Sequence, residues 1–438
     1  MPAMSSRPAR ARSFALWLGV ISVVAFAFRL TLLATIAKRN PSGGDPLYYH
    51  LQANFLVDGH GFSDPFWWKE TGEFRPVAIH PPVFTLWLAL SSVLGLKGFV
   101  AHKVMSCLAG ALAVTAIGLF GREIAGKRVG LIAAALATVY PPLWSIDGQL
   151  WPEGLFTAIV ALACWASVRA RDRPGWRWAA MSGALVGLAA LTRGEAIALA
   201  PLLIVPMLMV GRRRSWRANL ADLAAAGLAC LALIAPWAVR NSLTFNNPVP
   251  LSTNSDEVFV YANNPYAYGT VDGGRFIGFW YYPWQDELRA RDGEPPGDAS
   301  DQARHWREEG LGYARANKGR IPVVLAARLG RAWNVYAPFQ NASFDKIDGK
   351  SKPVSNAGVW AWWAALAASV PGAMILHRRG ITLIPFLALA GTVTASALYA
   401  YGGNRFRTPL DLAVLVLSAV AVDALLLRYG RERQVGSR

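Results

Sequence analysis

The sequence predicts an all-helical protein that crosses a membrane about ten times. Three observations support this fold class. Hydrophobic residues make up 54% of the 438 residues, they fall in blocks of roughly twenty, and short basic stretches separate the blocks. This layout is typical of a polytopic membrane protein, with one polar loop after the first span and a larger one late in the chain.

Ten apolar segments are the expected membrane spans. They lie at residues 14–36, 99–120, 129–147, 153–169, 178–192, 195–210, 219–239, 356–376, 381–400 and 412–427. The first span follows Arg7, Arg10 and Arg12, and no small-residue cleavage site follows it. We therefore interpret this span as an uncleaved signal anchor.

Topology explains the net charge of +17 better than nucleic-acid binding does, because the arginines lie between apolar blocks and form no continuous basic face. We interpret Pro81–Leu96 as a flat or re-entrant segment, since an additional span there would export the basic loops that follow. The basic residues then expected in the cytoplasm are Arg122, Lys127, Arg128, Arg169, Arg171, Arg173, Arg177, Arg212, Arg213, Arg214, Arg217, Arg378 and Arg379. Both termini are expected on this cytoplasmic side of the inner membrane.

Two polar regions are expected on the extracytoplasmic face. The first, residues 37–98, is expected to carry juxtamembrane helices; the second, residues 240–355, is expected to fold onto the membrane surface. Within the second, Arg320–Trp333 has apolar residues at helical spacing beside Arg328 and Arg331, which suits an interfacial helix with these two arginines at the membrane surface. The chain therefore divides into a transmembrane catalytic module (1–239), an extracytoplasmic region (240–355) and C-terminal transmembrane helices (356–438).

Cysteine and histidine spacing gives no sign of a disulfide or a zinc site. Cys107, Cys164 and Cys230 lie in apolar blocks without paired spacing, so we expect them to be packing residues. The histidines show no metal-ligand spacing, and His102, at a helix end, is expected to be solvated.

Two carboxylates are expected at the outer face. Asp45 follows two glycines just after the first span, and Glu153 opens the fourth span; Asp147 is a weaker candidate of the same kind. A positioned carboxylate can act as a base, and an acidic residue entering a membrane is costly unless it is used or paired. Two carboxylates can divide the work between a base and a contact to substrate or to a divalent cation such as Mg²⁺ or Mn²⁺. The alternatives are a turn residue for Asp45 and a helix-start residue for Glu153.

Candidate contacts for an anionic group also lie at the outer face. They are His80, Arg193, Arg240, Arg405 and Arg407. Each arginine opposes the positive-inside bias, and a phosphate leaving where lipid meets water needs such cations. The alternatives are interfacial snorkelling, a structural ion pair such as Arg193 with Glu195, and an ordinary surface histidine for His80.

In their order along the chain, these motifs resemble the GT-C superfamily of glycosyltransferases, of the family 39 and aminoarabinose-transferase type. The motifs that carry the resemblance are Asp45 with Tyr48 and Tyr49, His80-Pro81-Pro82, Trp151-Pro152-Glu153, Pro236-Trp237-Ala238-Val239-Arg240-Asn241, Leu251-Ser252-Thr253-Asn254, Asn263-Asn264-Pro265 and Arg405-Phe406-Arg407-Thr408-Pro409. Some relatives have a lysine where this sequence has His80.

The resemblance implies transfer of a hexose or pentose from a polyprenyl-phosphate carrier to an acceptor on the outer side of the membrane, usually with inversion. The expected partners are that donor, a lipid, glycan or protein acceptor, and membrane lipids, but no nucleic acid. Asp45 would be the base or acceptor-orienting carboxylate, with Glu153 as its acidic partner. The residues expected to contact the donor phosphate are His80, Arg240, Arg405 and Arg407, and those expected to contact substrate are Tyr48, Tyr49 and Arg193.

Two other function classes remain open. A transporter or lipid flippase predicts polar residues at mid-membrane depth and repeated halves. The acidic candidates cluster instead at the outer surface, and no internal repeat is visible, which favours an enzyme. A non-catalytic scaffold would leave Asp45 and Glu153 without a role.

Overall fold

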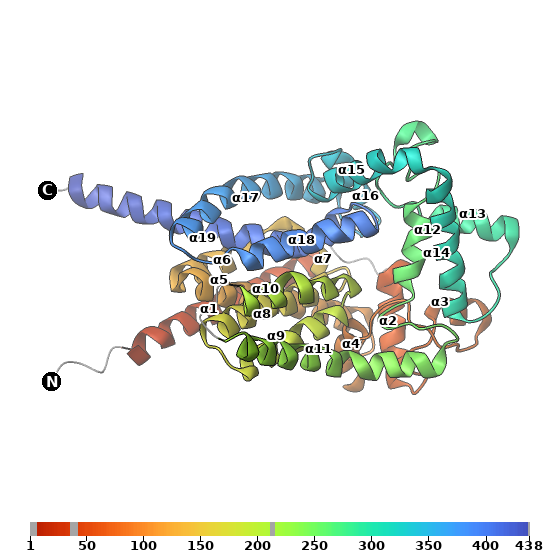
Figure 1. Ribbon diagram of the computed structural model, residues 1–438, viewed down its shortest axis with the longest axis horizontal. Coiled ribbons are helices and arrows are strands. Elements are labelled where there is room, and N and C mark those ends of the chain that lie inside the picture. Colours follow the sequence, from red (N-terminus) through yellow and green to blue (C-terminus); the bar gives the residue numbers. More distant parts are fainter. Residues whose placement is uncertain (1–6, 36–42, 211–214, 437–438) are drawn as a thin grey trace.

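The computed structural model describes residues 7–35, 43–210 and 215–436. These residues form helices and no β-strand, apart from an isolated antiparallel bridge between Ser63 and Pro76 (Figure 1). The predicted all-α fold class is confirmed. Arg212, Arg213 and Arg214 of the expected cytoplasmic loop, and the start of the first outer loop (37–42), lie outside the described residues.

Six of the described helices are long and apolar enough to cross a membrane. They are α1 (Arg7–Thr35), α5 (Phe99–Ala125), α8 (Glu153–Asp172), α11 (Trp216–Thr244), α17 (Lys352–Arg378) and α19 (Thr408–Gly436). The predicted span at 129–147 is a pair, α6 (Lys127–Val139) and α7 (Pro141–Asp147), bent by 57°. Proline cannot donate within a helix, and Pro141 and Pro142 start the second member of the pair. These helices make the chain an integral membrane protein.

The remaining predicted spans correspond to shorter helices. These are α9 (Trp176–Ala190), the sequence η1 (Gly194–Ala198), η2 (Ala200–Ile204) and α10 (Val205–Met209), and α18 (Ile384–Tyr399). A helix of fifteen residues is only about 22 Å long, short of a hydrocarbon core of roughly 30 Å. The number of ten spans therefore stays a prediction. The segment interpreted as flat or re-entrant contains α4 (Val83–Val93), which is shorter still.

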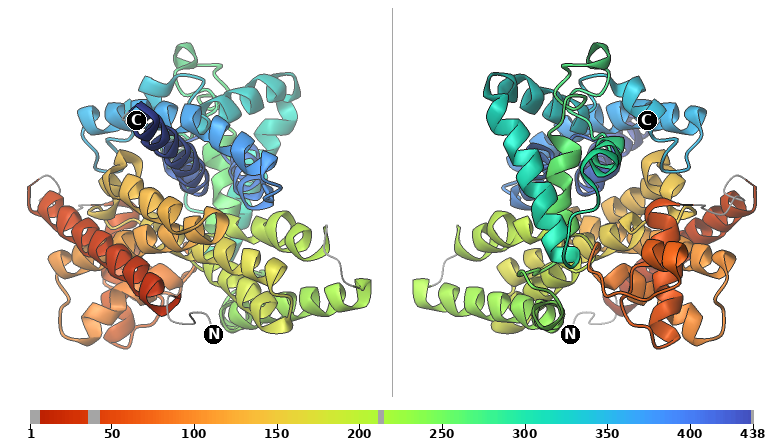
Figure 2. Two further views of the ribbon diagram at one scale, coloured as in Figure 1. Left: turned by 90° about the vertical axis from the view of Figure 1, so that its left-hand side faces the viewer. Right: turned by 90° about the vertical axis from the view of Figure 1, so that its right-hand side faces the viewer.

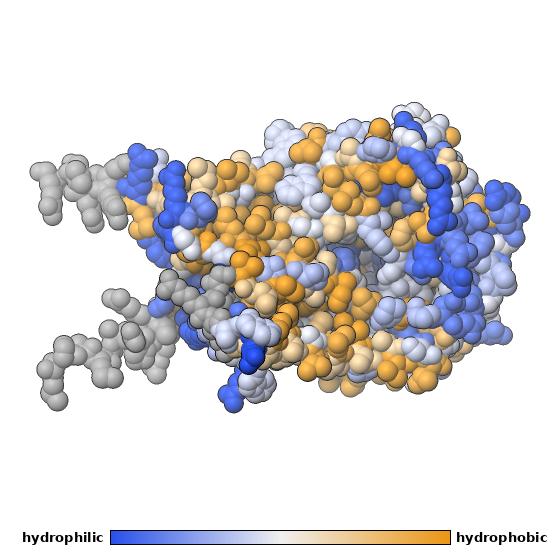
Figure 3. All heavy atoms as spheres, in the orientation of Figure 1, coloured by the Kyte–Doolittle hydropathy of each residue, from blue (hydrophilic) through white to orange (hydrophobic). Residues whose placement is uncertain are grey.

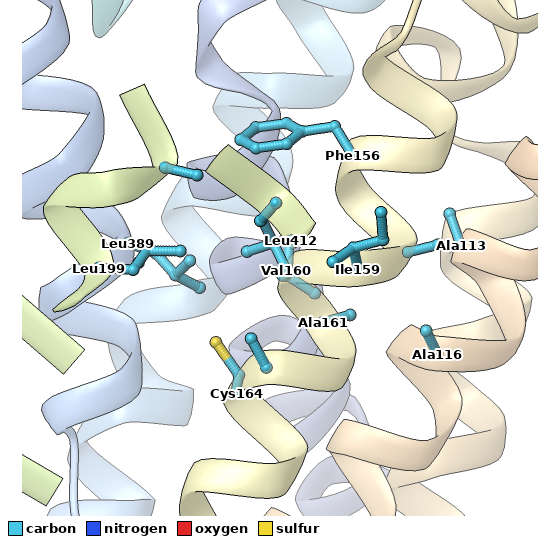
Figure 4. Close-up of a cluster of buried hydrophobic side chains, with 14 of the residues drawn as sticks. Ala113, Ala116, Phe156, Ile159, Val160, Ala161, Cys164, Leu199, Leu389 and Leu412 are labelled. Atoms are coloured by element: carbon cyan, nitrogen blue, oxygen red, sulfur yellow. The ribbon is translucent and has the colours of Figure 1, made fainter. Parts of the chain in front are cut away.

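Helix α8 forms the centre of the bundle. Fifteen of its twenty residues are buried, and it packs between α5 and α9 while also contacting α19. Figure 4 shows Ile159 of this helix on the side of Ala113 of α5, and Val160 beside Leu412 of α19. End-on views place α1 and α11 on opposite sides of this centre (Figure 2). Because α8 is enclosed, its first residue, Glu153, has a fixed position at one end of the bundle.

Helices α9 and α11 approach each other through glycines. A Cβ atom at Gly183 would lie 1.9 Å from the carbonyl oxygen of Ala226, and one at Gly187 would lie 2.8 Å from that of Cys230. Small residues four positions apart let membrane helices approach closely, so backbone atoms of the two helices come into contact. This contact fixes α9, whose C-terminal end leads to Arg193.

The end of the bundle opposite the two termini carries the polar helices (Figure 1). They are α2 (Gly44–Val57), α3 (Pro65–Thr71), α12 (Asn254–Ala262), α13 (Pro283–Asp292), α14 (Ala299–Ala316), α15 (Ile321–Ala332) and α16 (Pro338–Phe344). Figure 3 shows hydrophobic surface over the middle of the bundle and hydrophilic surface over α13 and α14. This distribution agrees with a bundle in lipid and a polar region beside it.

Two expectations about single residues need correction. The interfacial helix predicted at Arg320–Trp333 exists as α15, but Arg328 and Arg331 are buried, and both donate to backbone carbonyls, those of Ala262 and Ile277 among them. His102 is fully buried and not solvated. Its Nδ1 lies 3.0 Å from that of His50, because the start of α5 packs under α2 and α4.

The cysteines agree with the expectation. Cys107, Cys164 and Cys230 are buried and form no disulfide.

We expect Gly183→Ala to lower the apparent melting temperature of the protein in detergent, because the added methyl group overlaps the Ala226 carbonyl. Overpacking of this kind costs about 1–3 kcal/mol. Gly227→Ala, in α11 with no atom within 4 Å of its added Cβ, is the matched control and should be neutral or slightly stabilising. Equal melting temperatures for the two variants, measured by size-exclusion chromatography after heating, would contradict the close approach.

Candidate active site

The first outer loop supplies Asp45 on a short helix. Gly44 has φ of +65°, a left-handed conformation that favours glycine, and α2 begins there. Asp45 lies in the first turn with about a third (35%) of its side chain exposed. One turn later, Tyr48 and Tyr49 are buried. The helix therefore presents a carboxylate to solvent above two buried phenols.

His80 rests on these two tyrosines. Its ring stacks on Tyr49 with centroids 4.9 Å apart and meets Tyr48 edge-on at 5.0 Å. Its Nε2 lies 3.4 Å from Oδ1 of Asp45. The residue before Pro81-Pro82 and the acidic residue after the first span are therefore neighbours, as expected for one site.

The hairpin between α7 and α8 places Glu153 beside this group. Leu150, fully buried, has φ of +62°, a conformation that costs a non-glycine residue roughly 1–3 kcal/mol and persists only where the surroundings enforce it. Trp151 and Pro152 then lead into α8, whose first residue, Glu153, is fully buried. The strained turn is part of what aims the Trp151 ring and the Glu153 carboxylate at the same space.

Two arginines neutralise Glu153. Arg193 donates through Nη1 to Oε1 of Glu153, and through Nε to Oε1 of Glu195 at 2.6 Å. The Nε of Arg405 lies 3.4 Å from the same oxygen of Glu153. The ion pair of Arg193 with Glu195, which the sequence left as an alternative, is therefore present together with a second pair to Glu153.

Arg405 joins the two carboxylates. Its Nη1 lies 3.6 Å from Oδ2 of Asp45 and 3.4 Å from Oδ1 of Asp348. Its guanidinium lies 3.9 Å from the centroid of the Trp151 ring, within the range of a cation–π contact. The residue lies in η5 (Asn404–Arg407), directly before α19. One side chain thus connects the first outer loop, the α7–α8 hairpin and the loop at residue 348.

The charges around Asp45 keep it ionised. Burial by itself would raise its pKa, but His80, and then Arg405 and Arg193, outweigh this effect and hold the pKa of Asp45 well below its usual range. Burial raises the pKa values of Tyr48 and Tyr49. The site thus combines an anionic carboxylate with two neutral phenols.

Two predicted contacts lie apart from this network. Arg240 donates to the carbonyls of Val77 and Phe62, at 3.2 Å each, so it fixes the first outer loop to α11. Arg407 is buried, contacts Asp411 at 3.2 Å and lies over the Trp362 ring. Neither arginine forms an ion pair with Asp45 or Glu153 in the described part of the chain.

Asp147 is also separate. It forms a buried ion pair with Arg29 of α1, which ties the first span to the α7–α8 hairpin.

Sequence reasoning assigned no role to three residues at the site. Asp348 contacts Arg405. Burial raises the pKa of Tyr401, and the nearby charge of Arg405 partly offsets this effect. Phe406 lies near the guanidinium groups of both Arg193 (4.7 Å) and Arg405 (5.1 Å). Tyr401 and Phe406 lie close to Arg405 in the sequence, and this proximity could have predicted that they belong to the site. Asp348 lies among many charges in a polar loop, and nothing local distinguishes it.

Among the residues that the structure describes, no group of three or more His, Cys, Asp and Glu side chains is arranged to hold a metal ion. Asp45 and Glu153 both lie near the Arg405 guanidinium.

Part of the sequence matches a known family model. Residues 79–239 match the model described as dolichyl-phosphate-mannose-protein mannosyltransferase. The matched segment includes His80, Glu153 and Arg193 but ends before Arg405. No curated protein matches the chain in sequence.

Solved structures with a similar fold include the archaeal oligosaccharyltransferase AglB from Archaeoglobus fulgidus. Its complex with an inhibitory peptide and a dolichol-phosphate has a TM-score of 0.54 and 16% identity, with 96% of this chain and 52% of that chain covered. The same enzyme tethered to an acceptor peptide has a TM-score of 0.53 and 17% identity, with coverage of 96% and 51%. ArnT from Cupriavidus metallidurans bound to undecaprenyl phosphate has a TM-score of 0.42 and 15% identity, with coverage of 95% and 78%.

The chain spans about half the length of the oligosaccharyltransferase structures, and the shared part has a similar helical fold. The family match and this fold confirm the resemblance that the motifs carry.

We expect Arg405→Gln to destabilise the protein, because it leaves Asp45, Glu153 and Asp348 with fewer cations. Removing one partner from a buried ion pair costs about 3–5 kcal/mol, whereas Arg304→Gln, which breaks an exposed pair with Glu308, should cost less than about 1 kcal/mol. Melting temperatures in detergent measure both. The double variant Arg405→Gln/Glu153→Gln should recover part of the loss, and additive losses would contradict direct coupling.

Proposed function

We propose that this chain is a membrane glycosyltransferase that moves a sugar from a polyprenyl-phosphate carrier to an acceptor on the extracytoplasmic side of the inner membrane, with both termini in the cytoplasm. The observation that carries the proposal is the ion-pair network of Asp45, His80, Glu153, Arg193 and Arg405. It lies at the polar end of a helical bundle with the GT-C fold. Support comes from the matched family, described by a dolichyl-phosphate donor, and from the similar structure solved with a dolichol-phosphate.

Asp45 is the proposed base. Its low pKa makes it a weak base while His80 and Arg405 face it. A donor phosphate would compete with Asp45 for Arg405 and His80, and the loss of these contacts would make the carboxylate more basic when the donor is bound. Asp45 is also partly exposed, as a group that meets an acceptor must be. Asp45 would therefore act as an effective base only when the donor is bound.

The proposed reaction is a single inverting displacement. The acceptor hydroxyl attacks the anomeric carbon from the face opposite the phosphate, and its proton passes to Asp45. The bond between the anomeric carbon and the phosphate oxygen breaks, and the carrier phosphate leaves with the electron pair. Positioned cations stabilise the developing phosphate charge, which is the role proposed for Arg405 and His80.

Glu153 is proposed as the acidic partner that positions Arg405. It is fully buried, so it has no access to an acceptor in solution. Its Oε1 lies close to Arg193 and Arg405 at once. Arg193, with Tyr48 and Tyr49, is proposed to shape the substrate site, the tyrosines through the packing of the His80 ring.

Arg240 and Arg407 are proposed to act on the donor phosphate less directly than Arg405 and His80 do. Arg240 anchors the loop that carries His80, so its proposed effect on the donor phosphate is indirect. Arg407 lines a pocket beside Arg405 and pairs with Asp411, so its proposed effect on the donor phosphate is indirect as well.

No step of the proposed reaction uses a divalent cation. One structure of the archaeal oligosaccharyltransferase is described as a complex with zinc and sulfate. Here Asp45 and Glu153 face Arg405, so the proposed steps assign the phosphate charge to cationic side chains. The acceptor, whether lipid, glycan or protein, is proposed to meet α12–α14, polar helices at the same end of the bundle.

We expect Asp45→Asn to lower sugar transfer about 10²- to 10⁴-fold, because the amide cannot take the acceptor proton. The measurement uses membranes supplied with a panel of radiolabelled polyprenyl-phosphate hexoses and pentoses. Glu153→Gln should also lower transfer, since it removes the charge that positions Arg405.

Asp58→Asn is the matched control for this experiment. Asp58 ends the same helix, and its carboxylate forms an exposed ion pair with Lys97, so transfer should be unchanged. All variants must elute as folded protein at equal amounts. Transfer that survives Asp45→Asn would remove the site assignment. No transfer from any donor by the wild type would favour a transporter.

The pH dependence should show Asp45 ionised throughout the working range. A carboxylate with a lowered pKa stays ionised, and so stays available as a base, until the pH falls through that lowered value, which lies below the ordinary pKa of Asp of about 3.9. We therefore expect kcat/KM to show no acid limb from Asp45 between about pH 5 and 9. A fall beginning near about pH 5 that shifts in Asp45→Glu would contradict the lowered pKa.

A further inference from the structure

Two histidines meet inside the protein, apart from the candidate active site. His50 lies in α2, His102 lies in the first turn of α5, and both side chains are buried. Their Nδ1 atoms lie 3.0 Å apart, and the His50 ring stacks on Phe99 with centroids 3.6 Å apart. The reaction proposed above uses neither histidine, so their pairing needs an explanation of its own.

A chain of hydrogen bonds fixes where the neutral pair carries its protons. The amide of Asn54 donates from Nδ2 to the carbonyl of Lys97 at 3.1 Å, and its Oδ1 accepts from the Ser92 hydroxyl at 2.7 Å. The Ser92 oxygen is then an acceptor for His102, whose Nε2 lies 2.9 Å away. His102 therefore carries its proton on Nε2, and its Nδ1 accepts from Nδ1 of His50.

An additional proton can enter this chain without breaking it only at Nε2 of His50. A proton on Nδ1 of His102 would face the N–H of His50 and remove the bond between the two rings. Among the described residues, His80 forms an ion pair with a carboxylate, but His50 and His102 form none. A charge on His50 would thus be buried without compensation, and burial lowers the pKa of His50 from 6.5 to about 4.

The charged groups around the pair do not offset such a charge. Helix α4, which packs against both α2 and α5, contains no titratable residue. On α5 the next residue is Lys103, which is also buried and is basic as well. In the turn between α4 and α5, Lys97 is paired with Asp58 at the exposed end of α2, and Asp45 at the other end faces His80. These surroundings favour the neutral pair.

We propose that His50 and His102 form an acid-sensitive latch, which holds α2 on α5 while the pair is neutral and releases α2 when the pair takes up a proton. Because α2 carries Asp45, whose carboxylate faces His80, release would disturb the candidate site. The inference rests on the packing of α2 and holds whether or not the chain transfers sugar.

The pH range of the latch follows from the direction of the pKa change in His50. Folding lowers this pKa, so the stabilisation from the neutral pair is complete above the ordinary value of about 6.5 and is lost as the pH falls toward about 4. The release of α2 should be roughly 30-fold more favourable at about pH 5 than at about pH 7.5.

The test measures hydrogen–deuterium exchange and the melting temperature of the purified full chain in detergent at these two pH values. After correction for the intrinsic pH dependence of exchange, amides of Gly44–Val57 should exchange faster at the lower pH, whereas those of α14 should not. The melting temperature of the wild type should fall over the same interval.

His50→Asn keeps an amide N–H close to the position of Nδ1 but cannot take up the proton. It should reduce the acid-induced fall in melting temperature and remove the acid-induced exchange in α2. His305→Asn replaces an exposed histidine of α14, and this matched control should behave as the wild type does. An equal response of the wild type and His50→Asn overturns the proposal. Wild-type exchange in α2 that does not rise in acid also overturns it, and this result decides even where His50→Asn fails to fold.

Discussion

The structure depends on the neutralisation of buried carboxylates at the polar end of the bundle. Glu153 is fully buried at the start of the most enclosed helix, and an unpaired charge there would be costly. Arg193 and Arg405 meet it from different segments of the chain, and Arg405 also reaches Asp45 and Asp348. The first outer loop, the α7–α8 hairpin and the start of α19 are therefore held in one arrangement by charge pairing, while apolar packing holds the spans below them.

Rigid elements surround this network. Leu150 is held in a left-handed conformation, Trp151 lies against Arg405 and donates to the carbonyl of Asp348, and His80 is enclosed by two buried tyrosines. Strain of this kind is stable only where the surroundings enforce it. Asp45 is the partly exposed carboxylate of the network. The cations that face it are held in place by their surroundings, while its own side chain meets solvent.

Sequence patterns predicted the helices and the grouping of the main site residues, but they missed close helix contacts and the surroundings of several polar residues. Apolar blocks predict helices because a segment in lipid must satisfy its backbone hydrogen bonds internally. The order of the motifs along the chain was enough to group Asp45, His80, Glu153 and Arg405. Periodicity carries no information on close approach at Gly183 or on the bend before Pro141, so span lengths were less certain. Asp348, His102 and Arg331 were missed or misjudged because their surroundings are set by segments far away in sequence.

The position of Arg405 along the chain has a consequence for biosynthesis. Ribosomes synthesise Asp45, Glu153 and Asp348 before they reach Arg405, so the nascent protein contains these three carboxylates without the cation that they share. Until η5 forms, Arg193 is the cation that the structure pairs directly with Glu153. Insertion of α19 therefore completes the site as well as the bundle, because a chain that ends before η5 lacks the cation that joins Asp45, Glu153 and Asp348.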